Sequence, residues 1–568
     1  MLDLLSASKR TIRRVSTRMR KILLLLVCAA SVIAALAVTT TSQIPDQAKV
    51  IAGTERAVER HAKMSPPNAP GCAVGVSLDG KSVYEKGFGM ADLEYDIPIT
   101  AKTIFESGSV AKQFTAAAVI QLSLDGKLGL DDPVRKYIPE LPNYGSPLTI
   151  RHLLNHTSGI RDWGSVMELT GNGRSLRMIS QALALDVIYR QRSLNFKPGA
   201  EYSYSNSNYN LLAEIVERVS KQSFRTFMDE RFFKPLGMVS SSIRDDYQRI
   251  VPGRAQAYEG PLSGPWRLNM PFMNVYGNGG LLTTVGDWLK WNAMLDKGGP
   301  LVQEMETQGI LNDGRKISYA EGVFIDQQNG FRRVWHNGST AGYQTVLSRY
   351  PDLKLSIAIV CNSTSRTLPL EPDILKEIMG PFPGPASPPA AFPMTEEQLK
   401  SYVGSWRDES THNPVRTTFD NGTLRVSGAP MRPVGEDKFQ IGSTKINFIR
   451  DKKTGDLLTM ELDGGDQVQR LFAEHEWKPS AADLATLAGD WYSDEAQARF
   501  TLAIEGEKVF FIQRPSTKYE LRPTYKDGFA VPAGAIFWFT RDKSGKLDKL
   551  HVGVGTRLRD ITFERVTK

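Results

Sequence analysis

Residues 106–122 read ESGSVAKQFTAAAVIQL, an alanine-rich apolar helix pattern that a serine opens, with a lysine three residues behind it. Ser109 and Lys112 share one face of this predicted helix, about 5–6 Å apart at Cβ. A lysine here is usually a solvated surface charge, and a serine at a helix start is usually an N-cap. If this face borders a pocket, however, the pair is a nucleophile beside a cation. The rest of the sequence must decide between a surface pair and a catalytic pair.

Further motifs accompany the pair in order along the chain. Tyr204-Ser205-Asn206 stands on a predicted loop that enters an apolar helix, and His336-Asn337-Gly338 stands on a predicted strand. Two more polar and glycine-rich stretches fall between the other motifs. The full stretches are GAEYSYSNSNYNLLAEIVE (199–217), VWHNGSTAGY (334–343), RHLLNHTSGI (151–160) and GNGGLLTTVGDW (277–288).

In this order the motifs resemble the serine β-lactamase and penicillin-recognising hydrolase superfamily over about residues 50–375. The closest branch contains class C β-lactamases, D-alanyl-D-alanine carboxypeptidases, D-aminopeptidases and related esterases. The resemblance implies Ser109 as nucleophile, with Lys112 and Tyr204 as the groups that take its proton. We favour Tyr204 as the principal base and Lys112 as its partner, although the sequence leaves that division open.

Physical chemistry supports these roles. Ser109 at a helix start lies at the positive end of the helix dipole, which favours developing negative charge. A serine hydroxyl is a weak nucleophile without an adjacent base. Burial would lower the pKa of Lys112, and the lysine charge would lower the pKa of Tyr204.

The resemblance also assigns substrate-binding residues. Asn206 is expected to point its amide at a substrate carbonyl and at Lys112. The backbone N–H groups of Ser109 and Ser339, beside Gly338, are expected to form the oxyanion hole.

The third motif departs from the lysine-threonine-glycine of most β-lactamases. His336 would bind a substrate carboxylate only when protonated, near or below pH 6.5. Asn337 replaces the usual threonine hydroxyl. Both changes favour a substrate without a free acid at that end.

The chain has 568 residues, a pI near 9.1 and a formal charge of +8. Residues 1–21 carry seven basic residues and one acid, which leaves +2 for the other 547. The body is therefore nearly neutral, and we expect no nucleic-acid partner.

An uncharged apolar segment, ILLLLVCAASVIAALAV (22–38), follows the basic head. Positive charge stays cytoplasmic, so the chain after Thr39 is expected to be exported, to the periplasm or outside the cell. The segment is slightly long for a signal-peptide core and slightly short for a span, so cleaved signal and retained membrane anchor both stay open.

Changes in the predicted secondary structure along the chain indicate the domain boundaries. Hairpins are predicted over 71–89 with an Asp-Gly turn, over 322–338 turning at Asn329-Gly330, and over 343–362. Strands at both ends with helices between them predict an antiparallel sheet that the two ends complete together.

A second zone follows a linker with six prolines in fifteen residues, MGPFPGPASPPAAFP (379–393). LKSYVGSW (399–406) matches LATLAGDW (484–491), and NFIRDKKTG (447–455) matches WFTRDKSG (538–545). These matches predict two repeated eight-stranded antiparallel barrels, with Trp406 and Trp491 in their cores.

The expected architecture is an α/β (α+β) β-lactamase-like catalytic domain, its antiparallel sheet flanked by helices, followed by two antiparallel β-barrel domains. This layout is similar to the D-aminopeptidase branch, and we expect the barrels to fold over the active site and narrow it. The predicted parts are a signal peptide or anchor (1–44), the hydrolase domain (45–378), the linker (379–393) and the barrels (394–477 and 478–568).

Only Cys72 and Cys361 remain in the exported part, which is too few for a disulfide scaffold. The resemblance implies that their strands are antiparallel neighbours, which brings the two cysteines close. Whether they form a disulfide stays open, because cross-strand geometry is restrictive.

Other chemistries have weaker signals. The seven histidines lack metal-site spacing, so we expect neither metal nor cofactor, and His156 is expected to anchor a loop. GFGMAD (87–92) is a poor dinucleotide fingerprint, and no G-x-S-x-G elbow occurs.

The leading hypothesis is an exported serine hydrolase that acts through an acyl-enzyme on a small peptide or amide, as in a D-aminopeptidase. An esterase or D-alanyl-D-alanine carboxypeptidase with the same residues is the near alternative. A β-lactamase is less favoured because of His336-Asn337, and a non-catalytic penicillin-recognising sensor is least favoured. Homo-oligomer formation is left open.

Overall fold

The computed structural model describes residues 44–171, 177–365, 369–380, 391–513, 517–532 and 534–566. The predicted signal or anchor and residues 381–390 of the predicted linker lie outside these ranges. Within them, no helix combines the length and the apolar character that a bilayer crossing requires.

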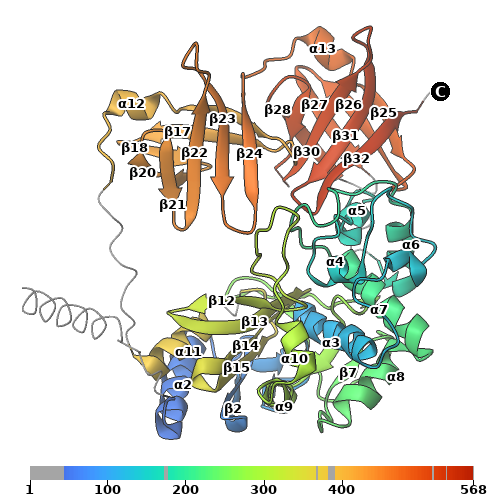
Figure 1. Cartoon of the computed structure of the whole chain (residues 1–568), viewed down its shortest axis with the longest axis vertical. Helices are drawn as coiled ribbons and strands as arrows, with labels where there is room; N and C mark the ends of the chain where they lie inside the picture. Colours follow the sequence, from blue (N-terminus) through green and yellow to red (C-terminus); the bar gives the residue numbers. More distant parts are fainter. Residues whose placement is uncertain are drawn as a thin grey trace, which may run out of the picture. The chain divides into compact units, whose positions relative to one another are not determined.

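A six-stranded antiparallel sheet forms the centre of the catalytic region, in the order β12-β13-β14-β15-β1-β2 (Figure 1). N-terminal strands therefore lie beside C-terminal ones, as predicted, and all three predicted hairpins are present. The strands are β1 (Cys72–Leu78), β2 (Lys81–Phe88), β12 (Phe324–Gln328), β13 (Phe331–Thr340), β14 (Tyr343–Tyr350) and β15 (Leu355–Cys361).

Helices cover both faces of this sheet, which is why β1 is buried along nearly its whole length. Val74 and Val76 on one face join the core made with α2 (Gln47–Ala62) and α11 (Leu370–Met379). Ala73 on the other face joins the main core beneath α3 (Ala111–Leu124) and α9 (Val285–Leu295). This alternation follows from the two-residue period of a strand.

Cys72 and Cys361 are directly opposite each other on β1 and β15, and the structure joins them by a disulfide. The bond ties the first strand of the catalytic region to the last one.

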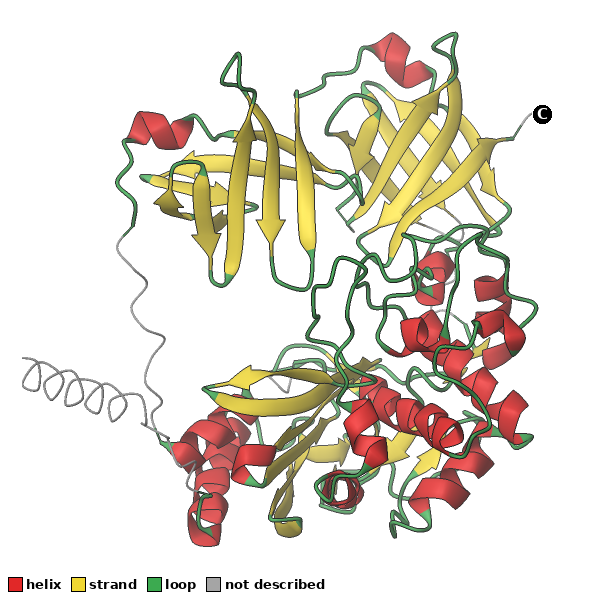
Figure 2. Cartoon of the chain, in the orientation of Figure 1, coloured by secondary structure: helices red, strands yellow, loops and turns green. Residues whose placement is uncertain are grey.

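A helical region lies beside the sheet (Figure 2). Its helices begin with side-chain caps at several ends, including Thr149 on α4 and Asp162 on α5. The helices not yet named are α4 (Ile150–Leu154), α5 (Trp163–Glu168), α6 (Gln181–Tyr189), α7 (Asn206–Ser220), α8 (Phe224–Met228) and α10 (Pro300–Met305). Short strands pair as β3 (Met90–Asp92) with β4 (Ile97–Pro98), β6 (Ile179–Ser180) with β10 (Met273–Asn274), and β8 (Tyr258–Glu259) with β9 (Arg267–Leu268).

A small sheet fixes the segment that leads to the start of α3. Its order is β5 (Phe105–Glu106), β11 (Leu281–Thr283) and β7 (Ser242–Ile243). Glu106 accepts two hydrogen bonds from Arg244, from Nε at 2.8 Å and from Nη2 at 2.7 Å. Both side chains are almost completely buried. The ion pair therefore clamps together the two outer strands of this sheet, because Glu106 lies on β5 and Arg244 directly follows β7.

The first C-terminal unit is a nine-stranded antiparallel sheet that forms a nearly closed barrel, where the sequence predicted eight strands. Its edge strands, β19 (Ala429–Pro430) and β20 (Arg432–Gly435), are separated only by Met431. The chain itself therefore joins the two edges, and within residues 391–513 no ladder closes them. Pro430 and Pro433 have no N–H to donate to such a ladder. After α12 (Glu396–Lys400), the remaining strands are β16 (Gly404–Asp408), β17 (Pro414–Asp420), β18 (Thr423–Val426), β21 (Lys438–Ile441), β22 (Thr444–Arg450), β23 (Leu457–Asp463) and β24 (Val468–Glu474).

The second C-terminal unit is a closed barrel of eight antiparallel strands, as predicted. Each unit starts with a one-turn helix that carries a capping box, followed by a strand with a buried tryptophan, Trp406 or Trp491. This correspondence agrees with the predicted repeat. The elements are α13 (Ala481–Ala485), β25 (Gly489–Ser493), β26 (Ala498–Glu505), β27 (Lys508–Gln513), β28 (Thr517–Pro523), β29 (Gly528–Ala530), β30 (Ala535–Arg541), β31 (Leu547–Val554) and β32 (Leu558–Arg565).

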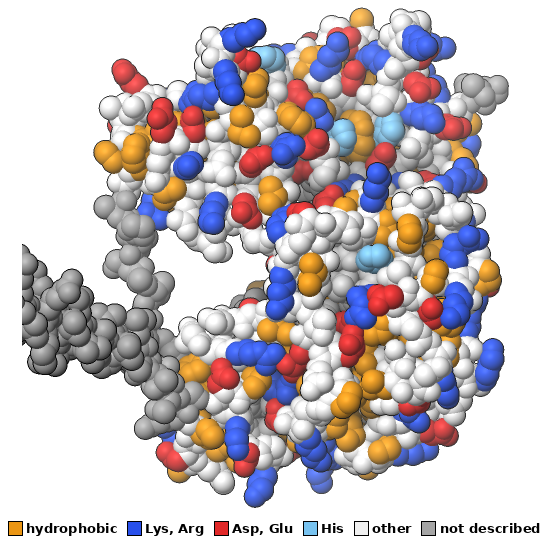
Figure 3. Space-filling model, viewed as in Figure 1, with side chains coloured by type: hydrophobic (Ala, Val, Ile, Leu, Met, Phe, Trp, Pro, Cys, Tyr) orange, Lys and Arg blue, Asp and Glu red, His pale blue; other side chains and the backbone are white. Residues whose placement is uncertain are grey.

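Lys and Arg side chains are interspersed with Asp and Glu over the face shown in Figure 3. The view shows no extended single-sign patch of the kind that nucleic-acid binding uses.

The Glu106–Arg244 pair gives a stability prediction. Glu106→Gln leaves the Arg244 guanidinium buried without its counter-charge, so we expect a loss of about 3–5 kcal/mol in the free energy of unfolding. Urea titrations would measure it. Glu106→Gln/Arg244→Met removes both charges and should lie closer to the wild type. A single variant as stable as the wild type would contradict the clamp.

Candidate active site

Ser109 lies on a single turn of 3₁₀ helix, η1 (Gly108–Val110), that runs directly into α3. Gly108 has a φ of 51°, in the left-handed region that glycine adopts without strain. This turn leaves Ser109 half-buried at the start of the helix. Lys112, one turn further on, is completely buried.

The Lys112 ammonium connects three segments of the catalytic region. Its Nζ donates hydrogen bonds to Ser109 Oγ at 3.1 Å, Asn206 Oδ1 at 2.9 Å and the Asn278 carbonyl at 2.7 Å. An ammonium has three N–H donors, so these acceptors match its full capacity. The cation is thereby held beside the serine rather than in solvent.

Asn206, the first residue of α7, is oriented by a buried carboxylate. Asp162 Oδ2 accepts from the Asn206 backbone N–H at 2.7 Å and from its Nδ2 at 2.9 Å. Because the amide nitrogen is taken by Asp162, the amide oxygen is presented to Lys112. Asp162 is therefore a positioning residue for Asn206.

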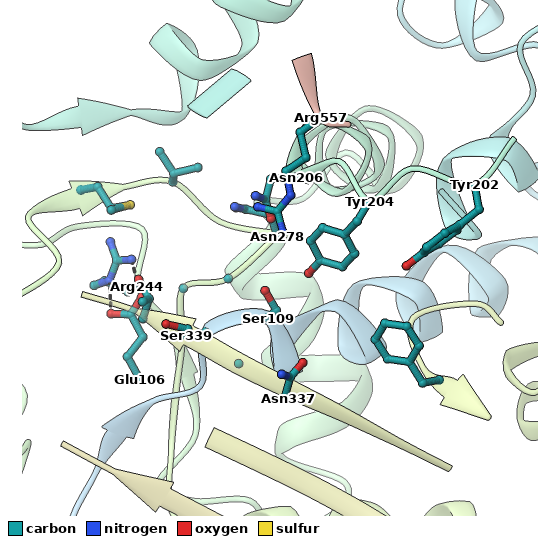
Figure 4. Close-up of a pocket in the computed structure, with 18 residues that line it drawn as sticks. Glu106, Ser109, Tyr202, Tyr204, Asn206, Arg244, Asn278, Asn337, Ser339 and Arg557 are labelled. Atoms are coloured by element: carbon teal, nitrogen blue, oxygen red, sulfur yellow. Dashed lines mark hydrogen bonds and ion pairs between the residues drawn. The ribbon is translucent and has the colours of Figure 1, made fainter. Parts of the chain in front are cut away.

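Tyr204 brings its phenol to the same place. Lys112 Nζ lies 4.8 Å from the centre of the Tyr204 ring, and Figure 4 shows the hydroxyl directed toward Ser109. The fold thus brings together three side chains that come from two sequence motifs: Ser109, Lys112 and Tyr204.

His156 packs against Tyr204, with ring centres 4.3 Å apart. Its Nδ1 accepts from the Asn208 side chain at 3.0 Å and from the Ser205 backbone at 3.3 Å. Burial, together with the Lys112 charge, lowers the pKa of His156 well below its usual value. The imidazole is a neutral anchor for the Tyr204 loop, in agreement with the predicted role.

Strand β13 lies against the turn that carries Ser109. A Cβ on Gly338 would be 2.1 Å from the Ser107 carbonyl oxygen and 2.9 Å from Ser109 N. A Cβ on Gly108 would be 2.6 Å from Ser339 N. Only glycines allow this approach, and it brings together the two backbones that carry the Ser109 and Ser339 amides.

His336 takes a different position from the predicted one. It is 1% exposed, and its Nε2 lies 3.1 Å from the Tyr319 hydroxyl. Alternation along β13 turns this side chain inward, so the pocket is lined by Asn337, Gly338 and Ser339 but not by His336. Burial first, and then the Lys112 charge, lower the pKa of His336 to about 3. The imidazole is therefore neutral near pH 7 and supplies no cation to a substrate.

The pocket above Ser109 has a volume of about 480 Å³. Its wall includes Asn206, Asn278 and Tyr204 on one side and the Glu106–Arg244 pair on another (Figure 4). One lining residue, Arg557, comes from the second barrel. That the barrels narrow the active site stays a prediction.

Asp162, Asn278 and Arg557 were not singled out from the sequence. Asp162 follows the RHLLNHTSGI stretch and Asn278 stands in GNGGLLTTVGDW. The motifs therefore indicated these segments, but the sequence could not indicate which side chains they contact. Arg557 stands in an ordinary hairpin turn, where no local signal exists.

Within the described ranges, no three His, Cys, Asp or Glu side chains gather into a cluster that could hold a metal ion.

Residues 58–376 match the protein-family model described as Beta-lactamase. The D-aminopeptidase of Brucella melitensis biotype 2 is 24% identical over 532 residues, covering 89% of this chain and 98% of the relative. The D-aminopeptidase of Gluconobacter oxydans is 26% identical over 452 residues, covering 78% and 83% respectively.

Solved structures of similar fold include the octameric penicillin-binding protein homologue from Pyrococcus abyssi. Its TM-score is 0.51 at 22% identity, covering 82% of this chain and 99% of that one. The structure of SurE has a TM-score of 0.52 at 23% identity, covering 74% and 98%.

The buried His336 gives a pH prediction. In the unfolded chain a histidine binds a proton near pH 6.5, whereas folded His336 stays neutral down to about pH 3. Its contribution to stability is therefore full above pH 6.5 and declines as the pH falls toward 3, by up to about 1.4 kcal/mol per pH unit.

Between pH 7 and pH 5 the wild type should lose about 2 kcal/mol more unfolding free energy than His336→Gln, which cannot titrate. Urea titrations at both pH values would measure this. Equal losses in the two proteins would show that His336 is already protonated or exposed.

Proposed function

The chain belongs to the β-lactamase family and is a serine hydrolase, and on that premise we propose that it is an exported amidohydrolase that works through an acyl-enzyme on Ser109. One observation carries the proposal. Ser109 and Tyr204 line one pocket, and the buried Lys112 ammonium lies directly behind them, within hydrogen-bond distance of Ser109 Oγ.

In the proposed reaction, Tyr204 acts as a phenolate beside the Lys112 ammonium. Ser109 Oγ attacks the scissile carbonyl carbon as its proton passes to that phenolate. The phenol returns that proton to the leaving amine when the C–N bond breaks, which leaves an ester on Ser109. Water then attacks the ester by the same route and releases the acid.

Tyr204 is the better candidate for the proton-transferring group. The Lys112 Nζ donates to three acceptors, so it is arranged as a hydrogen-bond donor beside the phenol and not as a proton acceptor. The nearby phenols of Tyr202 and Tyr319 are less suitable, because burial raises the pKa of each well above 10.

The carbonyl oxygen becomes negatively charged when Ser109 attacks. This oxyanion would accept hydrogen bonds from the backbone N–H groups of Ser109 and Ser339. Close packing at Gly108 and Gly338 supports this assignment, since it leaves both amides beside the reacting serine. Removal of one such donor costs about 3–4 kcal/mol of transition-state stabilisation in other hydrolases.

An amide substrate is supported by the relatives, whose names state D-aminopeptidase activity. Export is supported by the basic, then apolar, N-terminal sequence and by the Cys72–Cys361 disulfide, a bond typical of oxidising compartments. Attachment of residues 22–38 to a membrane remains part of the proposal.

Substrate turnover and intact mass test the proposal together. Purified wild type should hydrolyse at least one member of a panel of D- and L-alanine nitroanilides, short nitrophenyl esters and a chromogenic cephalosporin. Ser109→Ala should lose about 10³-fold or more in kcat, and Tyr204→Phe about 10²-fold or more.

Quenched wild-type reactions should show the acyl mass on the peptide that contains Ser109. Ser123→Ala, on the same helix but outside the pocket lining, is the matched control and should behave as wild type. Activity on esters alone would replace the amidohydrolase by an esterase, and undiminished turnover by Ser109→Ala would end the proposal.

A further inference from the structure

A turn of the second barrel enters the active-site pocket. Residues 555–557 connect β31 to β32, and Arg557 at the end of this turn lines the pocket. Its guanidinium carbon lies 5.0 Å from the centre of the Tyr204 ring. Figure 4 shows the side chain descending beside Asn206 and Tyr204.

The turn is fixed to the catalytic region through its backbone. The Arg557 carbonyl accepts from the Asp162 N–H at 3.0 Å and from Asn195 Nδ2 at 3.0 Å. The adjacent Thr556 carbonyl accepts from Ser203 Oγ at 2.9 Å. These bonds connect the turn to the residue that orients Asn206 and to the loop that carries Tyr204.

Arg559, two residues after the turn, strengthens the same attachment. Arg559 donates two hydrogen bonds to the Glu201 carboxylate, at 3.1 and 2.7 Å, and its backbone N–H donates to Asn195 Oδ1 at 3.0 Å. The hydrogen bonds that hold Arg557 are accepted by its carbonyl, so they stay in place when the guanidinium is removed.

The guanidinium is available for a ligand. Arg557 is exposed, and no acidic side chain of the described residues lies within ion-pair distance of it. It presents planar, paired N–H donors, the geometry that binds a carboxylate through two hydrogen bonds.

The other charges of the pocket do not offset this cation. Glu106 is the acidic residue in the lining, and it is already paired with Arg244 and approached by Arg254 at 3.4 Å. Lys112 adds a second positive charge behind Ser109. The two histidines nearest the site are neutral, since burial lowers the pKa of His156 and of His336.

We propose that Arg557 selects substrates whose acyl group carries a carboxylate near the scissile carbonyl, and that it disfavours acyl groups with a free ammonium. The inference rests on the proposed acyl-enzyme at Ser109 and specifies the substrate of that same site. Arg557 supplies the cation that His336 does not, and it supplies it beside Asn206, whose amide is expected to point at a substrate carbonyl.

A free α-ammonium would meet two positive charges and no uncommitted carboxylate among the described lining residues. A carboxylate at the same place would accept two hydrogen bonds from the Arg557 guanidinium. The barrel turn thus determines which acyl groups bind well, while the Ser109 chemistry is unchanged.

Three nitroanilides that differ only in charge test this proposal: alanine 4-nitroanilide with its amino group free, acetylated or succinylated, in the enantiomer that is hydrolysed. Wild-type kcat/KM should be highest for the succinyl substrate and lowest for the free amine. Arg557→Ala should lower the succinyl-to-acetyl ratio about tenfold and raise the ratio of free amine to acetyl.

Two controls sharpen the result. Arg522→Ala removes an exposed cation of the same barrel that is outside the pocket lining, and it should leave both ratios within about twofold. Raising the salt from about 0.05 to 0.5 M should reduce the succinyl preference of the wild type, because ions screen exposed charges.

Ratios that stay within twofold in Arg557→Ala, or a wild-type preference for the free amine, would overturn the role of Arg557. Labelling of Ser109 by an uncharged fluorophosphonate separates this failure from failure of the proposed function. If Ser109 is labelled and the ratios do not change, only the specificity inference is wrong, whereas an unlabelled Ser109 means that the acyl-enzyme proposal fails.

Discussion

A buried ammonium organises the catalytic region. Lys112 is withdrawn from water, which is costly for a cation unless its N–H groups find acceptors. The acceptors come from the serine turn, the start of α7 and the loop at Asn278. Each of these segments must therefore hold its place for the charge to be tolerated, and the same arrangement puts the cation beside Ser109, the proposed nucleophile.

The surrounding structure can be understood as support for that arrangement. Asp162 orients Asn206, and the Glu106–Arg244 pair fixes the strand that leads to Ser109. The second barrel reaches the same network, because the Asp162 N–H binds the Arg557 carbonyl. A C-terminal unit is thus connected to Lys112 through Asp162 and the Asn206 amide, and it adds the Arg557 cation to the pocket at the same point.

Sequence reasoning succeeded where the signal was local or where several motifs agreed. Ser109 and Lys112 followed from helical spacing, the hairpins from turns such as Asn329-Gly330, and Tyr204 from its motif's place in a family pattern. Arg557 was out of reach because its role depends on contacts with distant segments, and strand alternation alone could not say that His336 points inward. The ninth strand of the first C-terminal sheet was also out of reach, because β19 and β20 are short strands separated by one residue.

The most direct test of the central claim is the rate at which Ser109 is acylated when Lys112 is replaced by methionine. Methionine keeps much of the side-chain volume and removes the charge, so the fold should survive. The account predicts that labelling by an uncharged fluorophosphonate slows by about 10³-fold or more, in line with the loss of an activating partner. Labelling within tenfold of the wild-type rate, in a folded Lys112→Met protein, would contradict it.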